Sequence, residues 1–173
     1  MIIDILQREL TRARRDGEKG GVTIVLGDID HFESVNDTYG DGTGDEVLRE
    51  VACRLGDSVR SYDAVSRYGG GEFLLVLNGC RTRMGASRAE AIRRAIHERP
   101  VETATGTLAV SMSLGVAGTE DWQEANPEQL IKEPDIALYC AKELGRNRSV
   151  LAKPSGLQEI QMCSLTEDNV PAR

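Results

Sequence analysis

Three consecutive glycines, Gly69–Gly71, separate two strand-like runs within the stretch from Ala64 to Leu77. Glycine readily adopts the positive φ angles that a tight turn between antiparallel strands requires. The stretch therefore predicts a β-hairpin. A sheet that contains this hairpin includes at least one antiparallel pair, which excludes a purely parallel α/β architecture.

The rest of the chain alternates helical and strand-like patterns around this hairpin. The buried-strand pattern of Val22–Ile29 and a second hairpin across Thr103–Ala117, turning near Gly106, add further strands. Helical spacing predicts four helices: Ile3–Arg15, a helix from an N-cap at Asp45 through Leu55, Gly85–His97, and Asn126 to Gly145, with a kink at Pro134. This order predicts an α/β (α+β) fold with a single mixed, mostly antiparallel sheet flanked by helices.

Composition limits the number of domains and the classes of partner. The 173 residues suit one domain, which we expect at residues 1–150, followed by a C-terminal tail, residues 151–173, that is disordered in part. A net charge of −7 argues against nucleic-acid binding. The sequence has no apolar run of membrane-spanning length, and its four cysteines form no CxxC pair. We therefore expect a cytoplasmic protein without a membrane segment.

Two carboxylates, Asp28 and Asp30, lie at the end of the predicted strand Val22–Ile29. Alternate residues of a strand point to the same face, so both are expected on one side of the sheet. Carboxylate oxygens combined with substrate phosphates are typical ligands of Mg²⁺. These acids are therefore candidate metal ligands, although acids at strand ends are also common without any ligand.

Four segments occur in the order LGDIDHFESVNDTYGDGTGDEVL, RYGGGEFLLVL, SMSLGVA and ALYCAKELGRNR. In this combination the chain resembles the GGDEF family of diguanylate cyclases, which join two GTP molecules into cyclic di-GMP. The resemblance extends from about Leu6 to Val150. It implies a fold similar to the palm of nucleotide polymerases and nucleotidyl cyclases.

The resemblance also implies a role for each matching residue. Asp28 and the Ile29 carbonyl correspond to metal ligands, with Mg²⁺ or Mn²⁺ as the cofactor, and Glu72 to a second catalytic acid. Substrate-binding positions correspond to Phe32, to Asn36 and Asp45 at the guanine, and to Lys142 and Arg146 at the phosphates. A carboxylate suits guanine because guanine, unlike adenine, offers a donor at N1. Asp45 as a helix N-cap, and both cations as complements of a helix C-terminus, are the alternative interpretations.

A second ligand site is implied by Arg60-Ser61-Tyr62-Asp63, which is separated from Gly69 by five residues. It matches the RxxD motif at which family members bind cyclic di-GMP and are inhibited. Arginine suits the O6 and N7 acceptors of guanine. A helix arginine often completes this site, but Ala91 occupies its place, so Arg88 or Arg93 would have to substitute.

The main departure from the family pattern is Gly71, which replaces an acid that supplies a second metal-binding carboxylate. Glu33, Gly27 and Asp41 are milder departures. The main interpretation is a diguanylate cyclase that works as a homodimer and normally follows an N-terminal sensory domain. The alternative is a degenerate module that binds GTP or cyclic di-GMP without turnover.

Overall fold

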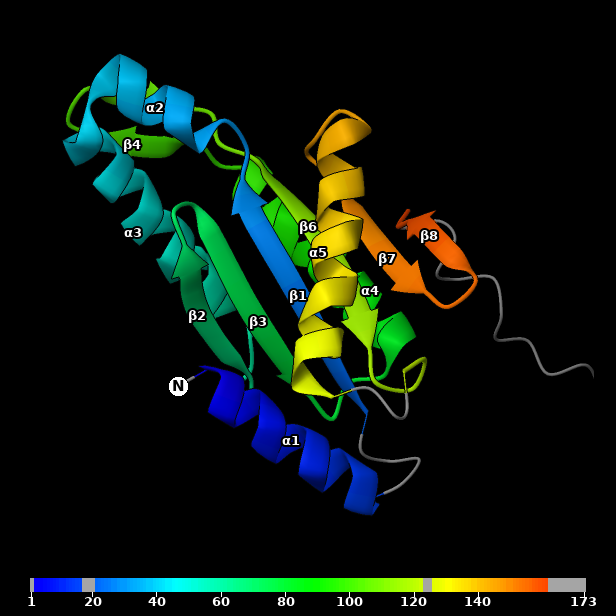
Figure 1. Cartoon of the computed structure of the whole chain (residues 1–173). Helices are drawn as coiled ribbons and strands as arrows, with labels where there is room; N and C mark the ends of the chain where they lie inside the picture. The colour runs from blue at the N-terminus through cyan, green and yellow to red at the C-terminus, as the bar shows by residue number, and fades with distance from the viewer. Residues whose placement is uncertain (1, 17–20, 123–125, 162–173) are drawn as a thin grey trace, which may run out of the picture.

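The computed structural model describes residues 2–16, 21–122 and 126–161 (Figure 1). A six-stranded sheet with the order β2-β3-β1-β6-β7-β8 forms its centre. All neighbouring strands are antiparallel except β6 and β7, which confirms the mixed, mostly antiparallel sheet. The strands are β1 (Val22–Ile29), β2 (Ala64–Gly69), β3 (Glu72–Asn78), β6 (Met112–Gly118), β7 (Ser149–Lys153) and β8 (Gly156–Glu159).

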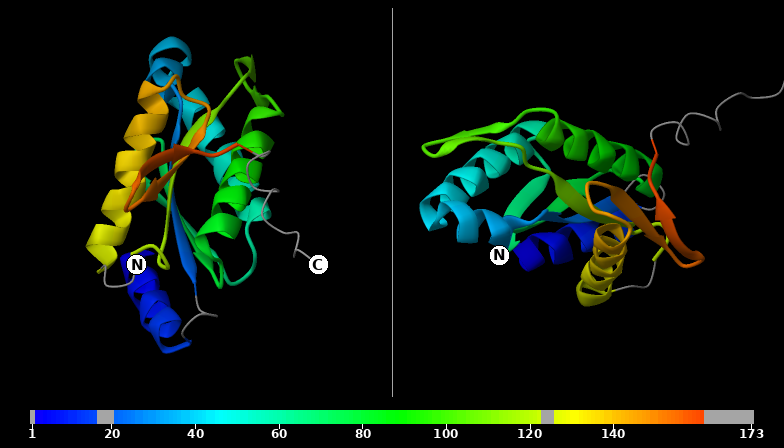
Figure 2. Two further views of the ribbon diagram at one scale, coloured as in Figure 1. Left: turned by 90° about the vertical axis from the view of Figure 1, so that its right-hand side faces the viewer. Right: turned by 90° about the horizontal axis from the view of Figure 1, so that it is seen from above.

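Helices cover both faces of this sheet. Figure 2 shows α1 and α5 on one face and α3 and α4 on the other, with α2 beyond one end of the strands. The helices are α1 (Ile2–Asp16), α2 (Phe32–Tyr39), α3 (Asp41–Ser58), α4 (Thr82–His97) and α5 (Pro127–Glu143). None of the helices in these described ranges is long and apolar enough to cross a membrane.

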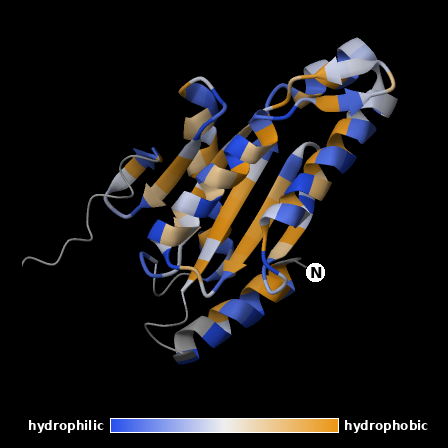
Figure 3. Ribbon diagram, turned by 180° about the vertical axis from the view of Figure 1, so that it is seen from behind, coloured by the Kyte–Doolittle hydropathy of each residue, from blue (hydrophilic) through white to orange (hydrophobic). Residues whose placement is uncertain are grey.

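The central strand β1 contributes to two hydrophobic cores because its side chains alternate between the faces. Val25 and Ile29 pack in the core under α3 and α4, whereas Ile24 and Leu26 pack with Leu6 of α1 and residues of α5. The strands at the centre of the sheet are accordingly the most hydrophobic part of the ribbon (Figure 3). A strand covered on both faces is fixed in position, so its carboxyl end is a rigid platform.

The glycine hairpin forms as predicted, with β2 and β3 joined at Gly69–Gly71. Gly70 has a φ of 37°, which a side chain would make unfavourable. The Ile29 amide donates to the Gly71 carbonyl at 3.1 Å. This bond fastens the hairpin tip to the end of β1.

The final predicted helix is confirmed, together with its start. Asn126 accepts from the Gln129 amide at 2.9 Å, and the Gln129 side chain accepts from the Asn126 amide at 3.2 Å. This capping box and Pro127 in the first turn fix the beginning of α5. The helix continues through Pro134 to Glu143.

The predicted helix start at Asp45 is wrong, because two helices occupy this region. Gly40 ends α2 by donating to the Asn36 carbonyl at 2.8 Å, and its own carbonyl accepts from the amides of Thr43 and Gly44 at the start of α3. The φ of 86° at Gly40 allows this sharp change of direction. Asp45 therefore lies inside α3, where it is exposed.

The second predicted hairpin is partly wrong. The chain does turn just before Gly106, but the two short strands there, β4 (Val101–Thr103) and β5 (Gly106–Leu108), pair only with each other. The apolar residues Met112, Leu114 and Val116 instead belong to β6, which pairs with β1 and β7 in the main sheet. Both faces of β6 are buried. The alternation of polar and apolar residues therefore could not show that β6 belongs to a different sheet from β4 and β5.

The chain beyond Val150 forms two further stretches of strand. β7 continues to Lys153, and β8 adds an antiparallel edge strand at Gly156–Glu159. The rest of the predicted tail, residues 162–173, and most of the predicted loop at residues 16–21 lie outside the described residues.

Candidate functional site

The carboxyl end of β1 brings three of the predicted site residues together. Asp28 is the register partner of Glu72 on β3, so both side chains project from the same face of the sheet. Lys142 reaches this point from α5, with its Nζ 2.7 Å from Asp28 Oδ2. Asp28, Glu72 and Lys142 are here called the carboxylate cluster.

Glu72 has an unusual electrostatic environment within the carboxylate cluster. Burial and then the nearby charge of Asp28 raise its pKa above the ordinary value, while Lys142 partly offsets this. A cavity of about 310 Å³ adjoins it, lined by Lys142 and by Asp135, Ile136, Leu138 and Tyr139 of α5. The cluster thus has adjacent space that a ligand can enter.

Gly71 lies directly against Asp28. A Cβ atom built on Gly71 would be 3.2 Å from Asp28 Oδ1 and 3.2 Å from the Phe32 side chain. A carboxylate at this position would therefore stand next to that of Asp28. The residue that departs most from the family pattern is thus at the centre of the candidate site.

Two divalent cations do not fit the residues that are present. No three His, Cys, Asp or Glu side chains in the described ranges are grouped as a metal site. Asp28 and the Ile29 carbonyl lie at the end of β1 and are candidate ligands of one ion. A second ion needs a further carboxylate ligand, and Gly71 has no side chain that could supply one.

Asp30 does not join Asp28 in the candidate metal site, contrary to the prediction from alternation. β1 ends at Ile29, and the Asp30 carboxylate is only 8% exposed. It accepts hydrogen bonds from the hydroxyls of Ser111 and Ser113, at 2.6 Å each, and from the Asn147 amide at 3.0 Å. Asp30 is therefore an internal acceptor that joins β1 to β6 and to the loop after α5.

Phe32 and Asn36 of α2 pack against Gly44 of α3, the residue before Asp45. A Cβ on Gly44 would lie 1.8 Å from Asn36 Oδ1 and 3.4 Å from the Phe32 ring, so only glycine allows this approach. Asn36 is therefore held against the residue that precedes Asp45. Gly44 was not among the predicted site residues, although its place in a glycine-rich run beside Asp45 was a usable signal.

Lys142 and Arg146 lie at the end of α5 and in the loop that follows it. The Arg146 amide donates to the Ala141 carbonyl at 3.0 Å, and its side chain is exposed. The next amide, that of Asn147, is the one bound by Asp30. This bond ties the loop to the residue that follows β1, the strand that carries Asp28.

The RxxD motif forms a compact turn before β2. The Asp63 side chain is fully buried and accepts from the amides of Arg60 and Asn78, each at 2.9 Å. Arg88 of α4 completes its surroundings, with Nη2 2.6 Å from Asp63 Oδ2. Arg88 and Arg93 were the two candidates for the arginine that Ala91 replaces. Arg88 is the one beside Asp63, while Arg93 contacts Glu90 and Asn147.

The Arg60 side chain lies at the surface of this turn. Its Nη1 donates to the Tyr62 hydroxyl at 2.7 Å, and its guanidinium carbon is 5.8 Å from the centre of the Tyr62 ring. Because the Asp63 side chain is enclosed, the exposed residues of the motif are Arg60, Ser61 and Tyr62.

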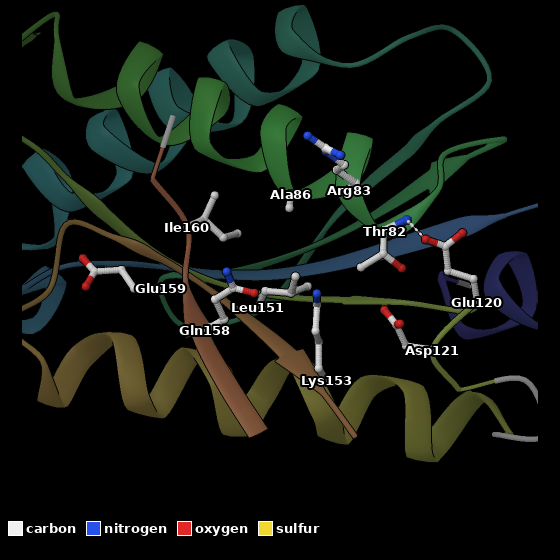
Figure 4. Close-up of a pocket in the computed structure, with 10 residues that line it drawn as sticks. All are labelled: Thr82, Arg83, Ala86, Glu120, Asp121, Leu151, Lys153, Gln158, Glu159 and Ile160. Carbon is white, nitrogen blue, oxygen red and sulfur yellow. Dashed lines mark hydrogen bonds between the residues drawn. The ribbon is translucent and has the colours of Figure 1, made fainter. Parts of the chain in front are cut away.

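A further cavity of about 310 Å³ lies between the start of α4 and strands β7 and β8 (Figure 4). Its wall includes Thr82, whose amide donates to Glu120, and the Lys153 side chain points into it. The adjoining Thr119 amide bonds to Val22, at the start of β1. The cavity is thus at the end of β1 opposite the carboxylate cluster and contains none of the predicted site residues.

Comparison with known proteins shows which family the chain resembles. The family model "Diguanylate cyclase, GGDEF domain" matches residues 1–148. The chain is 42% identical to diguanylate cyclase DosC of Escherichia coli over 155 residues, which is 87% of this chain and 32% of DosC. It is 41% identical to the response regulator PleD of Caulobacter vibrioides, over 75% of this chain and 29% of PleD. The chain thus spans about a third of the length of these relatives.

Solved structures show the same fold. The GGDEF domain of DgcB from Caulobacter crescentus, in complex with c-di-GMP, superposes with a TM-score of 0.79 at 31% identity, over 86% of each chain. The active GGEEF domain of a diguanylate cyclase from Vibrio cholerae gives a TM-score of 0.79 at 27% identity, over 87% of this chain and 93% of that one. The sequence match, the shared fold and the placed motifs together show that this chain belongs to the GGDEF family of diguanylate cyclase domains.

Proposed function

We propose that this domain binds GTP at the carboxyl end of β1 and condenses two GTP molecules into cyclic di-GMP, at a rate that Gly71 keeps low. The observation that carries the proposal is the gathering of the matched residues at one end of the sheet. Asp28 and Lys142 are in contact, and Asn36 packs against Gly44, the residue before Asp45. The first pair is proposed to lie at the phosphates of one nucleotide, and Asn36 and Asp45 at its base.

The guanine base is proposed to lie against α2 and α3. The exposed Asp45 carboxylate accepts from N1–H and the exocyclic amine of guanine, and the Asn36 amide adds donor and acceptor groups. Adenine has no N1 donor, so the same pocket disfavours ATP. The Phe32 ring, packed near Gly44, gives the base an apolar neighbour.

The triphosphate is proposed to bind at the end of α5. Arg146 offers a planar pair of donors to phosphate oxygens, and Lys142 offers a point charge. Lys142 pairs with Asp28, so its charge lies beside the proposed metal-binding carboxylate. A bound Mg²⁺ or Mn²⁺, held by Asp28 and the Ile29 carbonyl, would neutralise phosphate charge.

Cyclisation is proposed to need two domains that face each other. The ribose 3′-oxygen of one GTP bonds to the α-phosphorus of the other, the α–β phosphoanhydride bond breaks, and pyrophosphate leaves as the hydroxyl proton is released. The reciprocal step closes the ring.

We also propose that the protein is cytoplasmic. The described cysteines, Cys53, Cys80 and Cys140, are unpaired, which supports a reducing environment.

Gly71 also favours a second function, that of a binding module. An acid is missing at Gly71, where a Cβ would lie 3.2 Å from Asp28 Oδ1, while the residues proposed to bind guanine are retained. A domain of this kind would bind GTP or cyclic di-GMP and pass the signal on without turnover.

The experiment that separates these functions restores the missing carboxylate. We expect Gly71→Asp to raise the initial rate of cyclic di-GMP formation from GTP and Mg²⁺ by at least about 10–100-fold, the usual cost of disturbing groups around a metal. Product is measured at a protein concentration that populates dimers. Gly56→Asp, which adds the same charge at an exposed and open position of α3, is the matched control and should leave the rate unchanged.

Two outcomes would revise the proposal. A Gly71→Asp protein that is folded and binds GTP but forms no product would establish the binding module. A fast wild-type enzyme that gains nothing from the added acid would show that Glu72 or water already replaces it. Addition of Asp28→Asn to Gly71→Asp should abolish the gain if both acids act on one ion.

A further inference from the structure

Two consecutive residues of the loop after α5 have left-handed backbone conformations. Arg146 has a φ of 64° and Asn147 a φ of 45°. This region is unfavourable for residues other than glycine, although asparagine tolerates it better than most. Such a pair persists only when surrounding contacts hold it. The contacts that hold these two residues therefore fix the backbone position from which the Arg146 side chain extends.

The first contact is made by the backbone of Asn147. Its amide donates to Asp30 Oδ2 at 3.0 Å, and Asp30 is itself fixed by the hydroxyls of Ser111 and Ser113. A buried carboxylate that accepts several such hydrogen bonds is held in one orientation. The end of β1 therefore fixes the position of the loop immediately after Arg146.

The second contact is made by the Asn147 side chain. Arg93 Nη1 donates to Asn147 Oδ1, while the other nitrogens of Arg93 form a two-point ion pair with Glu90, at 2.9 and 2.7 Å. Glu90 is only 7% exposed and also accepts from the Ser149 hydroxyl at 3.0 Å. The guanidinium is thus oriented before it contacts Asn147, and α4 acts as a second rigid support for the loop.

We propose that Asp30 and Arg93 are positioning residues, which act through Asn147 to aim the Arg146 guanidinium at nucleotide phosphate. The inference rests on the phosphate role proposed for Arg146. Neither Asp30 nor Arg93 touches the nucleotide. Their effect is to hold an exposed cation in one direction, which lowers the cost of ordering it when phosphate binds.

The test compares the affinity for a non-hydrolysable GTP analogue with that for guanosine, which has no phosphate. Calorimetry measures the first and NMR titration the second. Arg146→Ala should weaken analogue binding roughly tenfold, as expected for a charged hydrogen bond, and leave guanosine binding unchanged. Asn147→Gly keeps the left-handed backbone accessible but removes the acceptor for Arg93. It should weaken analogue binding roughly threefold or more, again without an effect on guanosine.

A double-mutant cycle identifies the route of this effect. If Asn147 acts through Arg146, Asn147→Gly should have no further effect in the Arg146→Ala background. Arg93→Lys keeps the positive charge beside Glu90 but removes the planar guanidinium. It should reproduce the loss of analogue affinity seen with Asn147→Gly. Arg94→Ala, at the exposed neighbouring position of α4, is the control for a lost cation and should bind like the wild type.

The outcomes separate this inference from the proposed function. A loss in Arg146→Ala with none in Asn147→Gly would overturn the positioning role and leave the phosphate role standing. No loss in Arg146→Ala would overturn the phosphate role and this inference with it. Equal losses for the analogue and guanosine in Asn147→Gly would indicate a general structural effect and contradict the inference.

Discussion

At the scale of single residues, Glu72 shows how the sheet register sets the chemistry of the site. The pairing with Asp28 places two carboxylates on one face, and burial makes their charges harder to solvate. Both effects raise the pKa of Glu72 above its ordinary value of 4.5, and Lys142 compensates only in part. The protein therefore holds a proton on Glu72 more tightly when folded than when unfolded.

The sign of this shift predicts a pH-dependent stability difference. Ionisation of Glu72 destabilises the fold progressively as the pH rises from the ordinary pKa through the raised one, and the effect persists above it. Glu72→Gln should therefore raise the melting temperature near pH 7 but not near about pH 4. Thermal unfolding followed across this range measures the difference. Glu143→Gln, at an exposed position of α5, is the charge-matched control, and an equal gain there would contradict the explanation.

At the scale of elements, the approach of α5 to β6 positions Lys142 over the sheet. Gly115 allows this approach, because a Cβ on it would lie 1.8 Å from the Pro134 carbonyl oxygen and 2.5 Å from the Leu138 amide nitrogen. Both of these atoms belong to the helix backbone, which cannot move aside as a flexible side chain does. The distance between α5 and the sheet is therefore fixed by the absence of one methyl group.

Gly115→Ala should consequently destabilise the protein by about 1–3 kcal/mol or more, the usual cost of overpacking a core. Gly56→Ala is the control, and its effect on the free energy of unfolding should have the opposite sign, because Gly56 is exposed in α3 with open space around it. It should stabilise the protein by about 0.5–1 kcal/mol. Urea unfolding measures both changes, and a neutral Gly115→Ala would show that α5 is free to shift outward.

At the scale of the whole molecule, the candidate nucleotide site and the RxxD turn occupy different places. The first lies at the carboxyl end of β1, whereas the second precedes β2 and is tied to α4 by the Asp63–Arg88 ion pair. We therefore expect cyclic di-GMP to bind at the RxxD turn independently of GTP.

Arg60→Ala is the variant that tests this second site, because Arg60 is exposed whereas Asp63 is needed inside the turn. Loss of an arginine that reads guanine edges should weaken cyclic di-GMP binding about tenfold or more, with GTP binding unchanged. Calorimetry with each nucleotide measures this. Arg49→Ala, an exposed arginine of α3, is the control. Unchanged affinity in Arg60→Ala would identify Arg60 as an ordinary surface cation.

The sequence by itself determined most of the secondary structure and the motifs of this domain. Local signals were sufficient for the Gly69–Gly71 turn, the buried strand Val22–Ile29 and the capped start of α5, since each depends on neighbouring residues alone. The order of the motifs was sufficient to indicate the family. These features need no knowledge of what packs against them.

Tertiary structure alone decided which side chains meet. Asp28 and Asp30 look equivalent in the sequence, yet one pairs with Lys142 and the other is enclosed by two serines and Asn147, because β1 ends between them. The start of α3 at Asp41 depends on the Gly40 turn and on the packing of Asn36 against Gly44, which outweigh the low helix propensity of Gly42 and Gly44. The choice of Arg88 over Arg93 beside Asp63 likewise depends on contacts between distant segments, and local propensity carries no information about such contacts.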